Sequence, residues 1–143
     1  MLRLTNLADY AVSVMAIAAR QDGRASAARI AEATGLGAAT AAKLLNLLAK
    51  AGLLTSARGA CGGFVLARSA AEISLADVVE AVDGPIALTT CSSHGPVDCA
   101  VGATCPASHA WPQVSAGVRG ALAAVTLSQI AAGPMPGRAP EIA

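Results

Sequence analysis

The sequence has few large side chains and few charges. Tyr10, Phe64 and Trp111 are its only aromatic residues, and charged residues make up 13% of the 143 positions. Apolar residues make up 55%, but 36 of them are alanine, so the composition favours helix formation more than it fills a large core. A helical domain this poor in bulky side chains is expected to bury part of its apolar surface against a partner subunit.

Long apolar runs are absent as well. No uninterrupted stretch reaches the roughly 18 residues of a membrane-spanning helix. The apolar run near the N-terminus contains Asp9 and lacks the basic leader and cleavage site of a signal peptide. We therefore expect a cytoplasmic protein with no membrane partner. In that compartment, clustered cysteines bind metals or take part in redox chemistry more often than they form structural disulfides.

Motifs of catalysis are also missing from the sequence. It contains no glycine-rich phosphate loop and no nucleophile motif, and His94 and His109 are its only histidines. These residues do not supply the acid, base and nucleophile that most active sites combine. We therefore expect that the protein is not an enzyme.

The charges are distributed unevenly, although the net charge is only +1. Residues 1–68 contain eight basic and three acidic residues, a balance of +5. Residues 69–143 contain two basic and six acidic residues, a balance of −4. An N-terminal half of this kind suits binding to a polyanion such as DNA, and ordinary solvated surface charge is the alternative.

The N-terminal half is expected to begin with three helices. Apolar residues at steps of three and four predict a first helix that Thr5 or Asn6 caps and that ends near Gly23. A second helix is expected over about 26–35 and a third over about 38–51. Two helices joined by a glycine-containing turn form a helix-turn-helix, although such pairs are common in all-α proteins.

The third of these helices has two different halves. Its second half contains four leucines that are expected to face the core, whereas its first half presents only small side chains together with Thr40 and Lys43. A helix that enters the major groove of DNA needs an anchored half and a slim half. Thr40 and Lys43 are therefore candidate DNA-binding residues. The leucines are Leu44, Leu45, Leu47 and Leu48.

A β-hairpin is expected directly after the third helix. Residues 53–56 and 64–66 have the composition of short strands, and the segment ARGACGG between them carries Arg58 at the tip. A helix-turn-helix followed by a hairpin is a winged helix, and an arginine on a slim wing suits the narrow minor groove of DNA. The alternative is a plain turn with a solvated arginine. Cys61 in the same turn is expected to be inert, and the alternative is an exposed thiol beside DNA that could be oxidised.

The rest of the chain is expected to extend beyond the winged helix. A fourth helix is expected over about 73–82, opened by Ser74, and a long helix from His109 or Trp111 to about Ala132. The apolar stripe of the long helix is typical of pairing with an identical partner, although it could also pack against its own domain. The stripe comprises Trp111, Val114, Val118, Leu122 and Val125.

The fold class that follows is mainly α, a winged helix-turn-helix with a small β-hairpin wing and a long C-terminal dimerisation helix. We divide the chain into a DNA-binding domain (1–85), a cysteine-rich loop (86–108), the dimerisation helix (109–132) and a flexible tail (133–143), which is rich in proline and glycine. The loop would then be a sensor between a DNA-reading domain and a dimerising helix.

Three cysteines, Cys91, Cys99 and Cys105, lie in this loop with the spacing C-x7-C-x5-C. Glycines and prolines in and around the stretch predict neither helix nor strand. Thiolates suit zinc, copper(I) and iron–sulfur clusters, and a cluster usually has four protein ligands, so a fourth ligand would come from elsewhere or be labile. The alternatives are a zinc site completed by His109 and a metal-free thiol switch. Structural zinc sites tend to contain C-x2-C pairs, which this chain lacks.

At these residues the chain resembles a known family. The opening RLTNLADYAV, the wing ARGACGGFVLAR, the stretch AVDGPIALTTC and the cysteines that lead into HAW are similar to the IscR and NsrR type of bacterial winged-helix regulators. Within this type, the chain is most similar to the branch that regulates SUF iron–sulfur assembly genes. The similarity extends from Leu2 to about Ala132. It implies a homodimer that binds a near-palindromic operator in double-stranded DNA. It also implies one iron–sulfur cluster per subunit, of the 2Fe–2S or 4Fe–4S type, on Cys91, Cys99 and Cys105.

The resemblance also suggests sources of the fourth ligand. Asp9 occupies the place where NsrR-like proteins supply a carboxylate to the cluster of the other subunit, and its alternative role is to stabilise the dipole of the first helix. IscR-like proteins have a ligating histidine three residues after the last cysteine, where this chain has Ser108, and His109 follows one position later. His94 in the loop is a further candidate. The first cysteine gap is longer than in better-known members, and Ala42 stands where IscR-like recognition helices have an acid, so base preferences do not carry over.

The expected function is that of a DNA-binding transcriptional regulator, a repressor of SUF iron–sulfur assembly genes or stress genes, whose operator binding is controlled by an iron–sulfur cluster. One alternative is a zinc- or thiol-redox-based DNA-binding regulator without iron. Another is a winged helix that binds protein instead of nucleic acid. Steep salt dependence of binding to a duplex would separate the two DNA-binding hypotheses from the last one.

Overall fold

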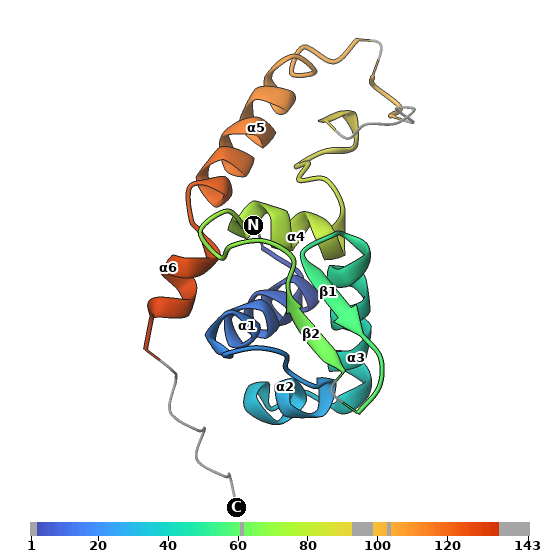
Figure 1. The fold of residues 1–143 in the computed structure, drawn as a ribbon. Coiled ribbons are helices and arrows are strands. Elements are labelled where there is room, and N and C mark those ends of the chain that lie inside the picture. Colours follow the sequence, from blue (N-terminus) through green and yellow to red (C-terminus); the bar gives the residue numbers. More distant parts are fainter. Residues whose placement is uncertain (1–2, 61, 93–98, 103, 135–143) are drawn as a thin grey trace, which may run out of the picture.

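Helices build most of the molecule, and one β-hairpin stands beside them (Figure 1). The computed structural model describes residues 3–60, 62–92, 99–102 and 104–134. The expected mainly α winged helix with a two-stranded hairpin is confirmed. In this part of the chain the elements are, in order, α1 (Asn6–Arg20), α2 (Ala27–Thr34), α3 (Ala38–Lys50), β1 (Leu54–Ala57), β2 (Gly63–Leu66), α4 (Leu75–Asp83), the 3-10 helix η1 (Thr90–Ser92), α5 (Ala110–Ala123) and α6 (Leu127–Ala132).

Side-chain caps determine where the first helices begin. The Thr5 hydroxyl accepts a hydrogen bond from the Ala8 amide at 3.0 Å and begins α1, which confirms one of the two expected caps. Ser26 begins α2 in the same way. The turn from α2 to α3 passes through Gly35, whose φ of 73° is a left-handed conformation that glycine adopts without strain. These caps satisfy amides that an isolated helix leaves unpaired, so the local sequence sets the observed boundaries.

The core lies where the first four helices meet the hairpin. From α3, Leu44, Leu45 and Leu48 are fully buried, whereas Leu47 is only half-buried and differs from the expectation. Each fully buried leucine stabilises the fold by about 1.5–3 kcal/mol. The second half of α3 is therefore anchored as expected. The other large side chains that are fully buried are Val14, Met15, Ile30, Ile73, Val78 and Leu127.

The hairpin is attached to the helix-turn-helix by a short bridge. The two strands are antiparallel, with register from Leu54 opposite Leu66 to Ala57 opposite Gly63. Ala25, in the connection between α1 and α2, exchanges two backbone hydrogen bonds of 2.9 Å with Phe64. Gly63 permits this approach, because a Cβ there would lie 2.8 Å from the backbone carbonyl oxygen of Ala25.

A capping box begins α4. The Ser74 hydroxyl accepts from the Asp77 amide at 3.2 Å, and the Asp77 carboxylate accepts from the Ser74 amide at 2.9 Å. Burial acts to raise the pKa of Asp77, but the hydrogen bonds from Ser74 and the charges of Arg68 and Arg119 outweigh it. The pKa of Asp77 therefore lies below its usual value of 3.8. The charged carboxylate stabilises the start of the helix.

The C-terminal segment differs from the expected single long helix, because it is divided into α5 and α6. Thr126 caps α6. The body of the protein fixes the break: the Leu75 amide donates to the Val125 carbonyl, and the Leu127 amide donates to the Ile73 carbonyl, both at 2.8 Å. Leu127 is fully buried, so α6 packs against the winged helix and α5 alone extends away from it.

We call α1–α4, the hairpin and α6 the body, and α5 with η1 the arm. In Figure 1 the arm leaves the body and carries η1 near its outer end. None of the helices in the described part of the chain combines the length and the apolar character that crossing a bilayer requires. Cys61, His94 and the expected tail from residue 135 onwards lie outside the described residues.

Candidate nucleic-acid interface and cysteine loop

The outer face of α3 presents an exposed stripe. Ala39, Lys43, Asn46 and Lys50 are exposed, and steps of three and four place them on one side of the helix. Thr40 is half-buried near the start of the same helix. The sequence analysis identified Lys43 as a candidate DNA-binding residue but did not include Asn46 and Lys50 on the same face. The spacing of Asn46 and Lys50 from Lys43 is the sequence signal that extends it.

Arg58 lies in the turn of the wing and is exposed. The turn is tight, because Gly59 has a φ of 106° and a Cβ at Gly62 would lie 2.5 Å from the Ala57 carbonyl oxygen. A side chain at Gly62 would collide with this backbone, whereas one at Gly59 would be held in a strained left-handed conformation. The glycines therefore keep narrow the loop that carries the arginine.

Three cations of the candidate nucleic-acid interface are not neutralised by acids of the body. Lys43, Lys50 and Arg58 form no salt bridge with the described residues. Arg68, by contrast, lies 3.6 Å from the Asp77 carboxylate. The unpaired cations can therefore each face a phosphate group without first breaking an internal ion pair.

The three loop cysteines stand in different surroundings. Cys91 lies in η1 and is half-buried, Cys99 is exposed and Cys105 is half-buried. The short helix at Cys91 differs from the irregular loop that glycine and proline predict. Cys91 Sγ lies 3.1 Å from Thr89 Oγ1. Within the described ranges, no three histidine, cysteine, aspartate or glutamate side chains are gathered as a metal site.

The candidates for a fourth ligand lie on different parts of the fold. Asp9 is exposed in the first turn of α1, on the body. His109 is exposed at the N-cap position of α5, on the arm. Of these two residues within one chain, therefore, only His109 lies on the arm, which also contains Cys91.

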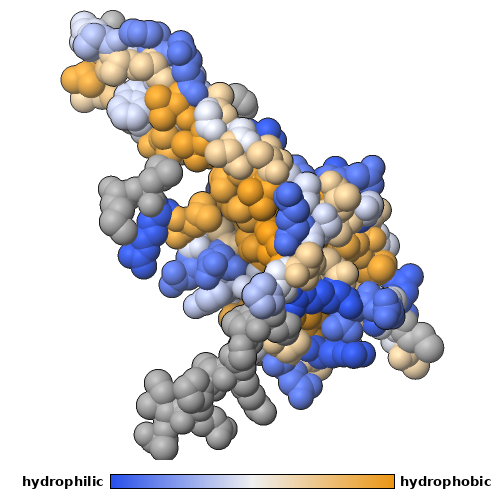
Figure 2. All heavy atoms as spheres, turned by 90° about the vertical axis from the view of Figure 1, so that its left-hand side faces the viewer, coloured by the Kyte–Doolittle hydropathy of each residue, from blue (hydrophilic) through white to orange (hydrophobic). Residues whose placement is uncertain are grey.

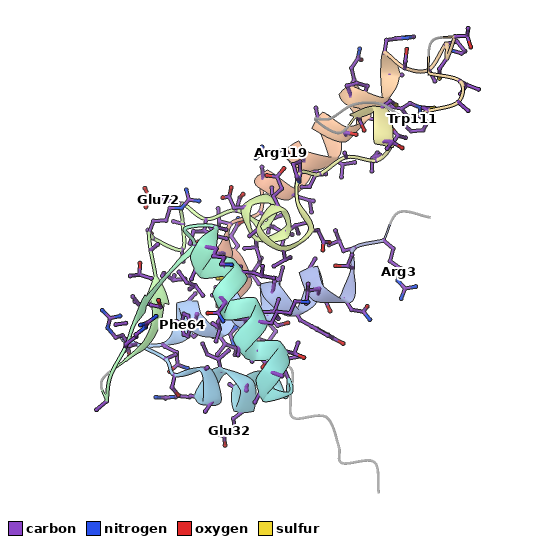
Figure 3. All side chains as sticks on the ribbon, turned by 90° about the vertical axis from the view of Figure 1, so that its right-hand side faces the viewer. Arg3, Glu32, Phe64, Glu72, Trp111 and Arg119 are labelled. Atoms are coloured by element: carbon purple, nitrogen blue, oxygen red, sulfur yellow. The ribbon has the colours of Figure 1, made fainter. Side chains whose placement is uncertain are left out.

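Glu80 on α4 fastens the arm to the body. Arg119 on α5 donates from Nε to Glu80 Oε1 at 2.9 Å and from Nη2 to Oε2 at 3.0 Å. The hydrogen bonds and the charge of Glu80 raise the pKa of Arg119 above its usual value. Figure 3 shows Arg119 at the base of the arm and Trp111 towards its outer end. A bidentate pair of this kind fixes the orientation of two helices as well as their separation.

The same helix α4 also contacts the start of α1. The Thr5 hydroxyl donates to the Asp83 carboxylate, whose two oxygens lie 2.9 and 2.8 Å away. Thr5 caps the helix turn that contains Asp9. Because α4 packs against α1, α3 and α5, it contacts both the arm and α3, the candidate DNA-reading helix.

The family model described as "Rrf2: Iron-dependent Transcriptional regulator" matches residues 4–133. The chain belongs to the Rrf2 family. This Rrf2 chain is also similar to the HTH-type transcriptional regulator IscR of Photobacterium profundum. The two are 36% identical over 131 residues, which is 90% of this chain and 75% of the relative.

Solved structures agree with this assignment. The Rrf2 chain is similar to CymR, the global cysteine regulator of B. subtilis, with a TM-score of 0.70 and 26% identity over 92% of this chain and 97% of that one. It is similar to T. potens IscR with a TM-score of 0.66 and 28% identity over 90% and 85% of the two chains. The protein is therefore a DNA-binding transcriptional regulator of the IscR type and, like these relatives, not an enzyme.

Proposed function

We propose that this Rrf2 regulator binds a near-palindromic DNA operator as a homodimer, and that an iron–sulfur cluster on Cys91, Cys99 and Cys105 controls the binding. The observation that carries the proposal is the position of the cysteines: Cys91 lies in η1 on the arm and Cys105 shortly before α5, while α4 packs against both α5 and α3. A change at the arm can therefore reach α3 through one packed element.

DNA reading is assigned to α3 and the wing. The first half of α3 exposes Ala38, Ala39 and Lys43 beside the half-buried Thr40, while its second half is anchored by buried leucines. Such a helix can enter a major groove without steric conflict. Arg58 on the narrow wing would contact a phosphate or enter the adjacent minor groove. Lys50 extends the cationic face at the far end of α3.

Dimerisation is assigned to α5. Trp111 and Val114 on this helix and Val125 just after it are 38%, 46% and 37% exposed, which is costly for large apolar side chains in water. Figure 2 shows apolar atoms gathered along the arm and at its junction with the body. A groove of about 450 Å³ lies at this junction, and a second copy can cover both the arm and the groove. The large aliphatic side chains that line the groove are Leu4, Val79, Ile86, Leu88, Val118 and Leu122.

The functional division of the chain stays part of the proposal, with one change. Residues 1–85 read DNA, residues 86–108 hold the cluster and α5 pairs the subunits. The segment 127–132, which the sequence assigns to the dimerisation helix, contributes Leu127 to the core of the body instead. The winged helix is therefore completed by a segment from beyond the cluster loop.

The donor groups fit an iron–sulfur cluster chemically. Three thiols lie between positions 91 and 105, and thiolates are the usual ligands of such clusters. Cys99 is exposed and the other two cysteines are only half-buried, so iron and sulfide can reach all three. When bound, the cluster would supply a centre that oxidant, nitric oxide or iron shortage can change. The protein's part is to hold this centre on the arm.

Asp9 offers a direct connection between a cluster and the DNA-binding winged helix. It is exposed in the turn of α1 that Thr5 caps, and Thr5 is hydrogen-bonded to α4. We propose that Asp9 of one subunit serves the cluster of the other, with His109 as the alternative ligand. An Asp9→Ala variant with unchanged cluster spectrum and unchanged operator affinity would remove this part of the proposal.

The proposed targets are genes of SUF iron–sulfur assembly or of a related stress response, which the regulator would repress. A regulator whose DNA binding depends on a cluster, and which controls the genes of cluster assembly, adjusts assembly to the supply of clusters. Because the proposed target is promoter DNA, we expect the protein in the cytoplasm.

Zinc is the rival metal. His109 begins α5 shortly after Cys105, and three thiols with one imidazole form a known type of structural zinc site. A zinc regulator would bind the same DNA through the same winged helix. It would be colourless, whereas a cluster protein absorbs visible light.

Oxygen-free purification with iron, sulfide and zinc analysis tests the cluster. We expect iron and acid-labile sulfide in the wild-type protein and their loss in Cys91→Ala, Cys99→Ala and Cys105→Ala. Cys61→Ala is the matched control and should retain both. Zinc without sulfide in the wild-type protein would support the zinc alternative, and metal-independent operator binding with no sulfide would refute the proposal.

A further inference from the structure

A chain of hydroxyl groups lies beside Cys91. Ser115 on α5 is only 4% exposed, and its Oγ accepts from the Leu88 amide and donates to Ser92 Oγ, both at 3.1 Å. Ser92 in η1 donates to the Thr89 carbonyl at 2.8 Å. Thr89 Oγ1 lies 3.1 Å from Cys91 Sγ. The hydroxyl groups therefore connect the arm helix to one of the candidate cluster ligands.

Counting protons gives the direction of the last hydrogen bond. A hydroxyl group donates one proton and has two lone pairs. Ser92 Oγ accepts from the Ser115 hydroxyl and from the Thr89 amide, the latter at 3.2 Å, and its own proton goes to the Thr89 carbonyl. Ser92 Oγ is then saturated. The Thr89 hydroxyl also lies 3.1 Å from it, so among these groups the Cys91 sulfur is the acceptor left for the Thr89 proton when Cys91 is a thiolate.

We propose that Thr89 is a positioning residue that donates a hydrogen bond to the Cys91 sulfur, and that Ser115 holds the η1 turn in the geometry that this bond needs. The inference rests on the proposed cluster site and assigns different roles to two of its cysteines. Cys91 is held by the arm before a cluster is present, whereas Cys99 is exposed.

The consequence for a cluster follows from charge. Hydrogen bonds to ligand sulfurs are among the factors that set the reduction potential of iron–sulfur clusters. A donor stabilises the reduced state more than the oxidised state, because the reduced state carries more negative charge. Thr89 should therefore raise the reduction potential, and Ser115 should act on it only through the turn.

The role of Ser115 is tested in the full-length protein without a cluster, by measuring the alkylation rate of each cysteine with mass spectrometry. Ser115→Ala removes the hydrogen bond to Ser92 in η1 and the one from the Leu88 amide just before it. Cys91 should therefore react about fivefold faster, the equivalent of about 1 kcal/mol, while the Cys99 rate stays constant. Ser128→Ala is the matched control, because the Ser128 hydroxyl bonds to Thr126 on the body at 2.9 Å. Equal Cys91 rates in Ser115→Ala and wild type would overturn the role of Ser115.

The role of Thr89 is tested by the reduction potential of the reconstituted protein. Thr89→Val keeps the shape and removes the donor. We expect it to retain the cluster but to lose about tenfold in the relative stability of the reduced state, which is about 59 mV for a one-electron couple. Thr89→Ser should restore the wild-type potential. Thr104→Val is the matched control, because the Thr104 hydroxyl bonds to the Val101 carbonyl at 3.5 Å. An unchanged potential in Thr89→Val would overturn the role of Thr89.

Failure of the proposed function gives a different result. If reconstituted wild-type protein contains no iron and sulfide, the proposed effect of Thr89 on a cluster is refuted together with the cluster. The alkylation experiment still decides whether Ser115 holds Cys91, since it uses no metal. A positive alkylation result without a cluster would identify an anchored thiol instead of a cluster ligand.

Discussion

The salt dependence of operator binding should change when single cations of the reading face are neutralised. Lys43, Lys50 and Arg58 form no salt bridge with the described residues, so each is available to a phosphate. Each phosphate contact contributes about 0.9 to the slope of log affinity against log salt. In a homodimer each substitution removes one cation from each of the two subunits. Lys43→Gln, Lys50→Gln or Arg58→Gln should therefore each reduce the steepness of the slope by about 1.8.

The assay is titration of a labelled operator duplex by fluorescence anisotropy between about 50 and 200 mM salt. Over this fourfold range, a slope change of about 1.8 narrows the affinity gap between wild type and variant about tenfold. Arg68→Gln is the control, because Arg68 already faces the Asp77 carboxylate at 3.6 Å, and its slope should stay near that of the wild type. Wild-type slopes in all three variants would refute the assigned DNA-binding face.

Three further predictions concern the core, the arm and acid stability. Leu45→Ala removes a fully buried side chain and should lower the free energy of unfolding in urea by about 2–5 kcal/mol, whereas Val101→Ala, at a side chain that is 58% exposed, should cost less than about 1 kcal/mol; equal losses would contradict the described core. Val114→Glu should raise the dissociation constant of the dimer at least about tenfold in sedimentation equilibrium, because it buries a charge in the proposed α5 interface. Ala116→Glu, exposed on another side of α5, should not, and two equally stable dimers would exclude α5 as the interface. The folded-state pKa of Asp77 is lowered, so its contribution to stability is present above pH 3.8 and is lost as the pH falls below it. Asp77→Asn should flatten the fall in apoprotein stability between about pH 4 and pH 2, and an unchanged slope would show that this carboxylate is not stabilised.

Local signals predict most of the body. Thr5, Ser26 and Ser74 cap helices in the structure because a hydroxyl at the start of a helix satisfies free amides wherever the helix lies. The contrast between small residues and leucines in α3 likewise depends on spacing within one helix. The exposure of Lys43 and Arg58 follows from the same patterns.

Such local signals do not predict contacts between segments that are distant in the sequence. The break between α5 and α6 depends on backbone hydrogen bonds to Ile73 and Leu75, which lie far earlier in the chain, and a continuous apolar stripe does not reveal it. The bridge of Ala25 to the hairpin is also purely backbone. The burial of Ser115 depends on its hydrogen bond to Ser92 in η1, and nothing in the sequence around Ser115 predicts that contact.

For the cysteine site, spacing and residue type predict the donors but not their arrangement. The structure places Cys91 in a short helix and leaves Cys99 exposed, and these surroundings depend on how the loop packs against α5. A ligand from the other subunit, as proposed for Asp9, depends on the geometry of a dimer. Sequence spacing within one chain contains no information on that geometry.

Control of operator binding by a cluster on the arm is the step on which the proposed regulation depends. Operator affinity should be determined for a single oxygen-free preparation with its cluster in place and again after removal of iron and sulfide. We predict acid-labile sulfide in the first state and a change in Kd of about fivefold or more between the two. Absence of sulfide, or the same Kd in both states, would contradict cluster control.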